Sequence, residues 1–344
     1  MESRDILTLN SEDVQGLLNG CDQEVLAAIA AAYKAHGRGE SSLPHSLFLR
    51  FPSDERSRII ALPAYLGDGF GIAGMKWISS FPANLEKGLE RASAVIILNS
   101  AQTGWPQVIM EGSLVSAKRT AASATLAAMH LTAREEPPRE VGIIGCGPIN
   151  FEVTRFLRAV WPSITSFYAF DVDVGRAEQF KQKWRRLRED VEVEVITEVS
   201  GVLRAAKLIS IATSATTPHI ASISECAPGS TILHVSLRDL SPEVILSNDN
   251  VVDDVAHVCR AQTSVHLAEQ WTGGRDFIRC TLAEILEGTA PAKKDPQAVT
   301  IFSPFGLGVL DLALAQLVVE LASKQKRGTL LENFLPHPQI TQMS

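Results

Sequence analysis

The chain has 344 residues, of which 45% are hydrophobic and 21% charged, a balance typical of soluble globular proteins. Its net charge of −7 argues against binding to nucleic acid or to an anionic membrane surface. No apolar run approaches the ~20 residues of a membrane span, and the acidic start of the chain lacks the apolar core of a signal peptide, so we expect a cytoplasmic protein.

The first third of the chain predicts a mixed or antiparallel sheet with two helices. Apolar residues recur on one face of residues 22–36, which favours a helix that ends at Gly37. Residues 113–131 favour a long, alanine-rich helix whose small side chains suit close packing on another helix or on a second subunit. Between them, strand-like runs separated by turn residues lie at 47–51, 58–62, 71–78, 94–98 and 107–111.

The pattern changes after residues 135–139, where two glutamates and two prolines precede an arginine. From there strand-like and helix-like segments alternate, which predicts a parallel sheet covered by helices on both faces. Residues 306–324 predict a last helix that returns to the first domain, and a polar tail follows. The predicted parallel strands are 141–145, 166–171, 191–196, 208–212, 231–236, 250–254 and 299–303.

The predicted fold class is therefore α/β, with one domain inserted in another. A Rossmann-type parallel-sheet domain is expected at residues 133–312. Residues 1–132 and 313–344 are expected to form an α+β domain for substrate binding and dimerisation. We expect the active site in the cleft between the domains, beyond the carboxyl ends of the parallel strands.

A glycine-rich motif, Gly-Cys-Gly-Pro-Ile-Asn at residues 145–150, joins the first parallel strand to a helix. Gly145 permits a tight turn, and Gly147 lets the backbone approach a pyrophosphate at the helix N-terminus. Asp171 ends the second strand, where a carboxylate binds a ribose 2′-hydroxyl and repels a 2′-phosphate. We therefore predict NAD rather than NADP. The alternative is an α/β turn that binds no nucleotide.

One position departs from this fingerprint: its third glycine is replaced by Asn150, whose side chain is expected to push the helix slightly off the strand. Five scattered cysteines without a Cys-x-x-Cys pair, and no His pair with metalloprotease spacing, predict a reduced protein without a metal site. The predicted cofactor-binding residues are Gly145, Gly147, Pro148, Ile149, Asn150, Asp171, Thr213 and Ser236.

Four basic residues of the first domain are candidates for binding a substrate. Lys76 lies in an otherwise apolar strand, where a lysine is costly unless it faces a cleft or a partner. Lys118 and Arg119 point about 100° apart on a helix, so we expect one of them, Arg119, to face inward. Arg50 and Arg91 have the simpler alternative of a solvated or surface-paired side chain.

Asp239 falls just beyond the strand predicted at 231–236, near the expected position of a nicotinamide ring. A carboxylate at this place can deprotonate an ammonium group or activate a water molecule. The alternative is that Asp239 caps the helical segment that starts near Pro242.

These motifs resemble the ornithine cyclodeaminase/μ-crystallin family over nearly the whole chain. The shared features are Gly-Met-Lys-Trp at 74–77, Lys-Arg-Thr-Ala-Ala-Ser-Ala at 118–124, Gly-Cys-Gly-Pro-Ile, Asp239, and the segment 302–308 followed by Asp311. Within the family, residues 75–84, 90–99 and 110–114 are similar to the branch of N-((2S)-2-amino-2-carboxyethyl)-L-glutamate dehydrogenases.

The resemblance implies an NAD-dependent oxidative hydrolysis of a secondary amine to 2-oxoglutarate and L-2,3-diaminopropionate, in siderophore or peptide natural-product biosynthesis, by a homodimer. It implies core roles for Lys76, Arg119 and Asp239, and a carboxylate-binding role for Arg50. We infer from the residues themselves that Arg91 binds an additional carboxylate of the substrate. Arg238 is a weaker candidate for the same role. The alternatives are an ornithine cyclodeaminase, which the charge of Arg91 disfavours, and a μ-crystallin-like protein that binds nucleotide and ligand without turnover.

Overall fold

The computed structural model describes residues 4–132 and 136–336, which form two compact units. Unit 1 contains the chain up to Ala28, Arg38–Ser116 and everything from Gly308 onward, and unit 2 contains Ile29–Gly37 and Ala117–Leu307. The helices α2 (Asp22–Gly37) and α3 (Ser113–Leu131) are divided between the units. The domain limits given above stay a prediction. Residues 1–3, part of the acidic start that argued against a signal peptide, lie outside the described residues. Residue 135, the first of the segment at which the sequence pattern changes, lies outside them as well.

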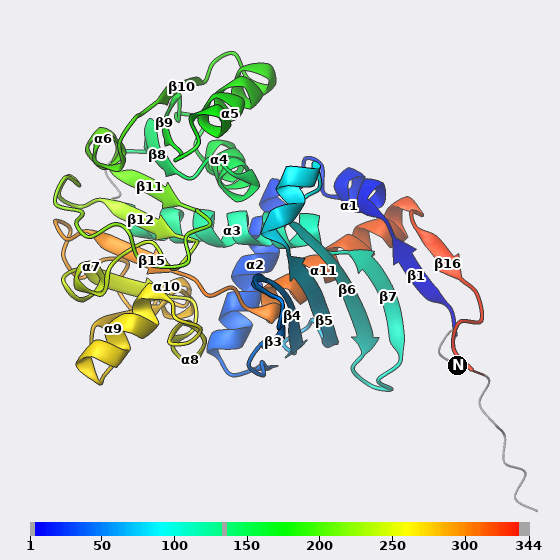
Figure 1. The fold of residues 1–344 in the computed structure, drawn as a ribbon. Coiled ribbons are helices and arrows are strands. Elements are labelled where there is room, and N and C mark those ends of the chain that lie inside the picture. Colours follow the sequence, from blue (N-terminus) through cyan, green and yellow to red (C-terminus); the bar gives the residue numbers. More distant parts are fainter. Residues whose placement is uncertain (1–3, 133–135, 337–344) are drawn as a thin grey trace, which may run out of the picture. The chain divides into compact units, whose positions relative to one another are not determined.

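Unit 1 is built on a mixed sheet with the strand order β16-β1-β7-β6-β5-β4-β2, in which β3 also pairs with β4 (Figure 1). Pairing is antiparallel except between β1 and β7. Helix α11 (Gly308–Gln325) packs across β4, β5 and β6, and α1 (Ser11–Leu17) lies against α11 and β7. The strands are β1 (Ile6–Leu9), β2 (Ser41–Ser42), β3 (Leu47–Phe51), β4 (Asp54–Leu66), β5 (Ile72–Ser80), β6 (Ala92–Ser100), β7 (Pro106–Glu111) and β16 (Thr329–Leu331), with a 3-10 helix at Pro82–Lys87.

The prediction of a polar tail after Lys324 is wrong for part of that segment. Thr329–Leu331 forms β16, which pairs antiparallel with β1, and neither strand was predicted. All three residues of β16 are exposed, so this strand has no apolar alternation by which a sequence pattern could reveal it. It forms because the edge of β1 offers unpaired backbone groups.

Unit 2 contains the predicted Rossmann-type parallel sheet, with the strand order β10-β9-β8-β11-β12-β15-β13-β14, and the predicted fold class is confirmed (Figure 1). Its strands are β8 (Glu140–Ile144), β9 (Ser166–Phe170), β10 (Glu192–Val195), β11 (Leu208–Ile211), β12 (Thr231–His234), β13 (Asp249–Val252), β14 (Ile278–Thr281) and β15 (Thr300–Ser303). Its helices are α4 (Pro148–Val160), α5 (Val174–Leu187), α6 (Val199–Ala205), α7 (Pro242–Leu246), α8 (Val255–Val258), α9 (Ser264–Thr272) and α10 (Leu282–Leu286). Only β14 was not predicted among these strands.

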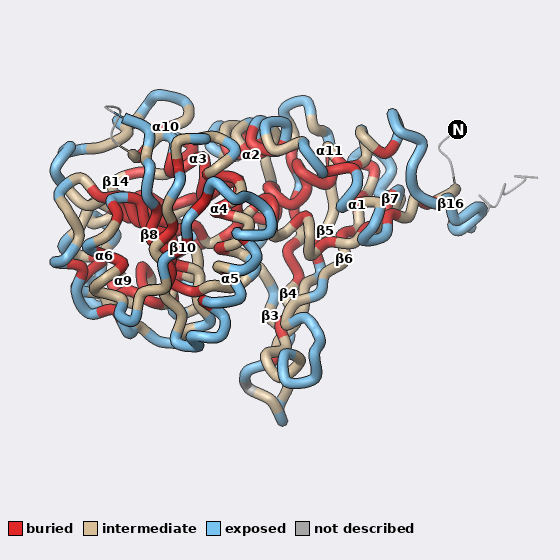
Figure 2. The backbone as a smooth tube through the Cα atoms, turned by 90° about the horizontal axis from the view of Figure 1, so that it is seen from above, coloured by how far each residue is buried: buried red, intermediate tan, exposed pale blue. Residues whose placement is uncertain are grey.

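The core of unit 2 lies along its central strands. Every residue of β11, β12 and β15 is buried, which agrees with sequences that are largely apolar and do not alternate with charged residues. Figure 2 shows much of this sheet in red inside paler helices. The chain runs from β8 outward to β10 and then returns to place β11 on the other side of β8. Ligands of open parallel sheets bind at such a reversal, beyond the carboxyl ends of the strands. Among the described residues, no helix is both long and apolar enough to cross a bilayer.

Candidate active site

The glycine turn lies at the reversal of the parallel sheet, between β8 and β11. Gly145 has a φ of +90°, and a Cβ at this position would stand 2.4 Å from the Ala212 carbonyl oxygen, so a larger residue would collide. Helix α4 begins at Pro148 and Ile149, with Gly147 as its N-cap and no side chain of the described residues capping it. A Cβ on Gly147 would meet no described atom within 4 Å. This open helix N-terminus fits the pyrophosphate of NAD.

Asn150 is fully buried behind this turn and hydrogen-bonded at both ends of its amide. Its Nδ2 donates to the carbonyl oxygens of Ile144 at 3.0 Å and Gly145 at 2.6 Å. Its Oδ1 accepts from the Ser210 hydroxyl at 2.7 Å. The side chain at the third position of the fingerprint therefore ties α4 to β8 and β11, and it fixes the carbonyl that precedes the phosphate-binding turn.

Asp171 follows β9 directly and is half-buried. One of its oxygens accepts from the Cys146 N–H at 2.8 Å, and the other accepts from the Asp173 N–H at 2.9 Å. A carboxylate oxygen has two lone pairs, so a ribose hydroxyl can still bind. Burial and the Asp171 charge raise the pKa of the Cys146 thiol to about 12, which leaves this cysteine unreactive in the turn.

Asp239 lies past the end of β12 and is completely buried. The Thr213 hydroxyl donates to its Oδ1 and the Ser236 hydroxyl donates to its Oδ2, while His234 Nε2 lies 3.3 Å from Oδ2. Burial alone would raise the pKa of this carboxyl, but the hydrogen bonds from His234, Ser236 and Thr213 lower it to about 2. Thr213 and Ser236, predicted to bind the cofactor, are thus gathered around Asp239.

The surrounding backbone fixes Asp239 as well. Its carbonyl oxygen accepts from the N–H groups of His219 at 2.9 Å and Ile220 at 2.8 Å. The N-cap of α7 is Ser241, whose side chain accepts from Val244 N–H, so the alternative capping role of Asp239 is wrong. Arg238, the weaker candidate, donates to the Ala261 carbonyl oxygen at 2.7 Å.

Lys118 and Arg119 are both buried, each 8% exposed, so the prediction that only one of them faces inward is wrong. Lys118 Nζ lies 3.8 Å from Glu152 Oε2 on α4 and over the Phe156 ring, which gives the second cation its own partners. Two cations in sequence can both be buried on one helix because each finds a different neighbour.

Arg119 borders a tight turn at Gly306. A Cβ on Gly306, which has a φ of +90°, would stand 2.7 Å from Arg119 Nη1. The buried Asp253 accepts from the N–H groups of Phe305 at 2.8 Å and Gly306 at 2.7 Å, and burial raises its pKa. Asp253, which the sequence did not single out, therefore holds this turn beside the Arg119 guanidinium.

Lys76 is 2% exposed on β5, and Asp311 of α11 is its partner within unit 1. The two side chains form an ion pair with 2.8 Å between Lys76 Nζ and Asp311 Oδ2, and Nζ also donates to Ser116 Oγ at 3.0 Å. A buried ammonium needs such a partner to remain charged. Lys76 consequently lies on the face of the mixed sheet that α11 covers.

Three arginines gather at one end of the mixed sheet. Arg50 pairs with Arg58 across β3 and β4, Arg58 pairs with Ser80 of β5, and Ser80 pairs with Ala92 of β6, which Arg91 precedes. Arg50 and Arg58 share a face with Lys76, because side chains alternate along each strand. Arg58 was not predicted, since only the pairing of β3 with β4 brings it opposite Arg50.

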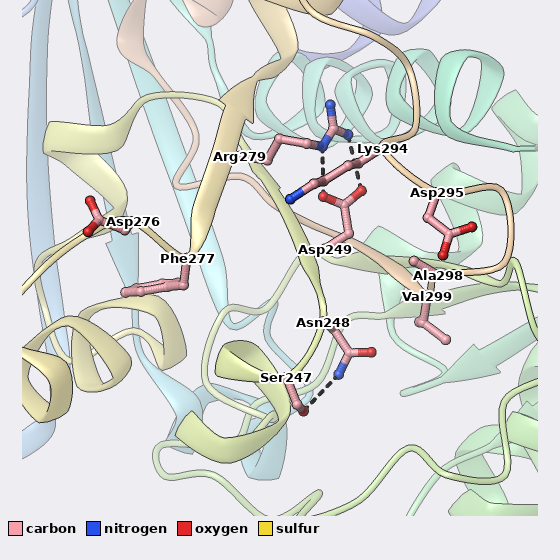
Figure 3. A pocket seen from close by; sticks show the side chains of 10 residues that line it. All are labelled: Ser247, Asn248, Asp249, Asp276, Phe277, Arg279, Lys294, Asp295, Ala298 and Val299. Atoms are coloured by element: carbon pink, nitrogen blue, oxygen red, sulfur yellow. Dashed lines mark hydrogen bonds and ion pairs between the residues drawn. The ribbon is translucent and has the colours of Figure 1, made fainter.

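A cavity of about 430 Å³ lies at the amino ends of β13, β14 and β15, whereas the glycine turn follows the carboxyl end of β8 (Figure 3). Arg279 binds both oxygens of Asp249, at 2.7 and 3.1 Å, and donates to the carbonyl oxygens of Pro291 and Ala292. The Arg279 guanidinium thus holds the loop that contains Pro291 and Ala292 against β13. None of the predicted site residues lines this cavity.

Comparison with known proteins shows the family to which the chain belongs. The model of the ornithine cyclodeaminase/mu-crystallin family matches residues 6–326. The N-((2S)-2-amino-2-carboxyethyl)-L-glutamate dehydrogenase of Staphylococcus aureus is 27% identical over 335 residues, which cover 96% of this chain and 99% of the relative.

Two solved structures are similar in fold. The crystal structure of CmnK has a TM-score of 0.86 and 27% identity, covering 96% of this chain and 99% of CmnK. An archaeal alanine dehydrogenase dimer with bound NAD has a TM-score of 0.84 and 26% identity, covering 95% and 99% of the two chains. The resemblance predicted from the motifs, and NAD as the cofactor, are confirmed.

Proposed function

Because the chain belongs to the ornithine cyclodeaminase/mu-crystallin family, we propose that it oxidises N-((2S)-2-amino-2-carboxyethyl)-L-glutamate to 2-oxoglutarate and L-2,3-diaminopropionate. It is an NAD-dependent oxidoreductase of amine CH–NH groups. The finer choice of substrate is supported by similarity to the Staphylococcus aureus dehydrogenase. We further propose that the enzyme serves siderophore or peptide natural-product biosynthesis.

The observation that carries this choice is the cationic end of the mixed sheet, where Arg50 and Arg58 share a face with Lys76 and Arg91 directly precedes β6. Arginine binds carboxylates through paired N–H donors, so this group suits a substrate with more carboxylates than alanine or ornithine has. Leu62, the strand partner of Lys76, is four residues from Arg58 along β4, or roughly 13 Å. Two long side chains and a substrate with carboxylates at both ends can bridge that distance.

In the proposed reaction the glycine turn and the N-terminus of α4 would hold NAD, which would supply the acceptor for the hydride that leaves Cα of the glutamate portion. Lys76 and Arg119 bind the α-carboxylate at this reacting end, while Arg50, Arg58 and Arg91 bind the remaining carboxylates. Asp239 accepts a proton from the amine or from the attacking water. Water then cleaves the substrate imine, so the products are a keto acid, a primary amine, NADH and one proton.

A substrate panel tests the proposal directly. The purified protein is incubated with NAD and the secondary amine, L-alanine or L-ornithine, and NADH absorbance and product masses are recorded. We expect NADH, 2-oxoglutarate and diaminopropionate from the secondary amine alone. Proline without accumulated NADH from ornithine would instead identify a cyclodeaminase. A folded, NAD-binding protein that turns over none of them would contradict the proposal.

Variants at the cationic end test its role. Arg58→Gln and Arg91→Gln should each lower kcat/KM for the secondary amine about 10- to 100-fold, the equivalent of one charged hydrogen bond of roughly 1.5–3 kcal/mol. The matched control is Arg204→Gln. It removes an exposed arginine of α6 that pairs with Glu225, and it should leave kcat/KM unchanged. Equal values for all three variants would refute a carboxylate-binding role.

We also propose that the protein is a homodimer joined through the outer face of the mixed sheet. Leu47, Leu49, Tyr65 and Trp77 are 69%, 48%, 40% and 38% exposed. Register places Leu47, Ala61 and Trp77 in one row on the face opposite Lys76. A contiguous apolar face of this kind marks an interface, and the similar archaeal alanine dehydrogenase is a dimer.

The interface has a simple test. Leu47→Glu combined with Trp77→Glu should convert a dimer to a monomer in analytical ultracentrifugation. The control is Trp271→Glu, which changes a more exposed tryptophan on α9 and should leave the dimer intact. A wild-type protein that sediments as a monomer would refute the proposal.

A further inference from the structure

His234 is the last residue of β12 and has no exposed surface, yet it faces the carboxylate that the proposed reaction uses. Its Nε2 lies 3.3 Å from Asp239 Oδ2, and its Nδ1 lies 3.3 Å from Ser303 Oγ. The backbone N–H of Asp239 also points at Nε2, with 3.2 Å between the two nitrogens. The imidazole therefore contacts the side chain and the backbone of the same aspartate.

These contacts make two opposite demands on Nε2. To accept from the Asp239 N–H it must be unprotonated, which places the ring proton on Nδ1, where Ser303 Oγ accepts it. To bind Asp239 Oδ2 it must carry a proton and donate. One nitrogen cannot do both at once, but each contact serves one protonation state. The neutral ring and the imidazolium thus both find partners without movement of the heavy atoms.

Asp239 is poorly suited to keep a proton where it stands, because three side chains contact its oxygens. Against the opposing effect of burial, His234 first and then the Ser236 and Thr213 hydroxyls lower the pKa of the carboxyl to about 2. Such a carboxylate returns a proton quickly. An imidazole nitrogen can accept a proton and later release it, and His234 Nε2 lies 3.3 Å from Asp239 Oδ2, within reach of the proton that Asp239 would pass on.

We propose that His234 is a positioning residue that takes up, through Asp239, the proton released by the substrate amine. This inference rests on the proposed function. The amine N–H bond breaks and an O–H bond forms on Asp239; that proton then moves to Nε2, which leaves Asp239 ionised and His234 an imidazolium. No electrons are transferred in these steps, because the hydride leaves separately from Cα. Among the described residues, the side chains that hydrogen-bond to the pair are Thr213 after β11, Ser236 after β12 and Ser303 at the end of β15.

The first test replaces the ring by an amide that can hydrogen-bond but does not titrate at these pH values. His234→Asn should lower kcat about 100-fold, within the usual contribution of proton transfer, and should abolish the fall of kcat on the acid side of neutrality. NAD affinity, measured by fluorescence titration, should not change. The matched control is His219→Asn, since only the backbone of that exposed residue contacts Asp239. A His234→Asn enzyme with wild-type kcat and pH profile would overturn the proposal.

A second variant covers the case in which His234→Asn does not fold. Ser303→Ala removes the acceptor of Nδ1–H, which stabilises the imidazolium more than the neutral ring. The acid limb of kcat should therefore shift to lower pH while the fold is kept. An unshifted limb would overturn the proposal, because a purely structural serine would not alter the profile.

The last test needs no turnover and so separates this inference from the substrate assignment. Nitrogen NMR of the NAD-bound full-length protein, with labelled histidine, follows His234 between pH 5 and 9. We expect a neutral ring protonated on Nδ1 at high pH and, in Asp239→Asn, protonation at lower pH than in the wild type. A ring that stays neutral throughout, or that ignores Asp239→Asn, would overturn the proposal even if the secondary amine proves to be the substrate. Absence of NADH with every amine would reject the proposed function alone.

Discussion

The ion pair of Lys76 and Asp311 should dominate the stability of unit 1 whenever one partner is removed. Both side chains are buried, and 2.8 Å separates Nζ from Oδ2. Coulomb's law with an effective dielectric constant of about 20 gives roughly 6 kcal/mol of attraction at that distance, most of which offsets the desolvation of the two charges. The net contribution of the intact pair is therefore small, whereas an isolated buried charge is costly.

We expect Lys76→Met and Asp311→Asn each to lower the free energy of unfolding by about 3–5 kcal/mol. The double variant removes both charges and should be less destabilised than the sum of the single variants by up to about 3 kcal/mol. Urea unfolding is followed by tryptophan fluorescence in a background in which the tryptophans of unit 2 (Trp161, Trp184 and Trp271) are replaced by phenylalanine, so that the signal reports on the unit that carries the pair. A two-unit protein can unfold in two steps, so the transition of unit 1 is fitted separately.

The matched control is an exposed pair, Arg38 with Asp68 in unit 1, whose side chains are 40% and 44% exposed. Exposed pairs contribute about 0–1 kcal/mol, so Arg38→Gln should have little effect. Additive losses in the Lys76 and Asp311 cycle would refute the reasoning, because the two groups would then act independently. Equal effects of the exposed and buried variants would refute it as well.

Three further results follow from the geometry of unit 2. Gly306→Ala adds a Cβ against the Arg119 guanidinium at a φ of +90°, so kcat/KM should fall at least tenfold in initial-rate assays while the NAD Kd stays constant. Asn150→Ala removes bonds to the Gly145 carbonyl and Ser210, so NAD should bind roughly 5- to 10-fold more weakly by fluorescence titration, and an unchanged Kd would contradict the assigned role. The pKa of Asp239 is lowered from 3.8 to about 2, so its ionised form stabilises the fold above pH 3.8 and this stabilisation is lost as the pH falls toward 2. The free-energy difference between wild type and Asp239→Asn in denaturant unfolding should therefore shrink by about 1 kcal/mol from pH 7 to pH 3.

Local patterns in the sequence were sufficient for much of the fold. Alternating apolar residues revealed β3 to β7, and continuous apolar runs between turn residues revealed the buried strands of unit 2. The glycine motif was recognisable because it follows β8 directly and opens α4. The short strand β16 escaped because its pairing with β1 depends on two segments from opposite ends of the chain.

The contacts of several site residues could not be predicted from sequence, because their partners lie far away in the chain. Arg58 looks like the start of a strand, and its place opposite Arg50 depends on the register of β3 and β4. His234 was assigned to the interior of a strand predicted to continue to residue 236. The strand ends at His234 instead, which turns the imidazole toward Asp239. Lys76 was noticed as an anomaly in an apolar strand, and Asp311 was named only as a family feature, so their pairing was not predicted.

The charged residues of the proposed site fall into two groups. Lys76 and Asp239 are buried and already have partners, and the arginines of the mixed sheet form the second group. Lys76 is balanced by Asp311, and the hydroxyls of Thr213 and Ser236 already solvate Asp239, so neither group needs to reorganise when a substrate binds. A balanced lysine attracts an anion weakly over a distance, since the field of its partner cancels much of its own. We therefore propose that the affinity for a substrate with several carboxylates comes from the arginines of the mixed sheet. In the same proposal Lys76 and Asp239 act where charge develops during the reaction, which agrees with their burial.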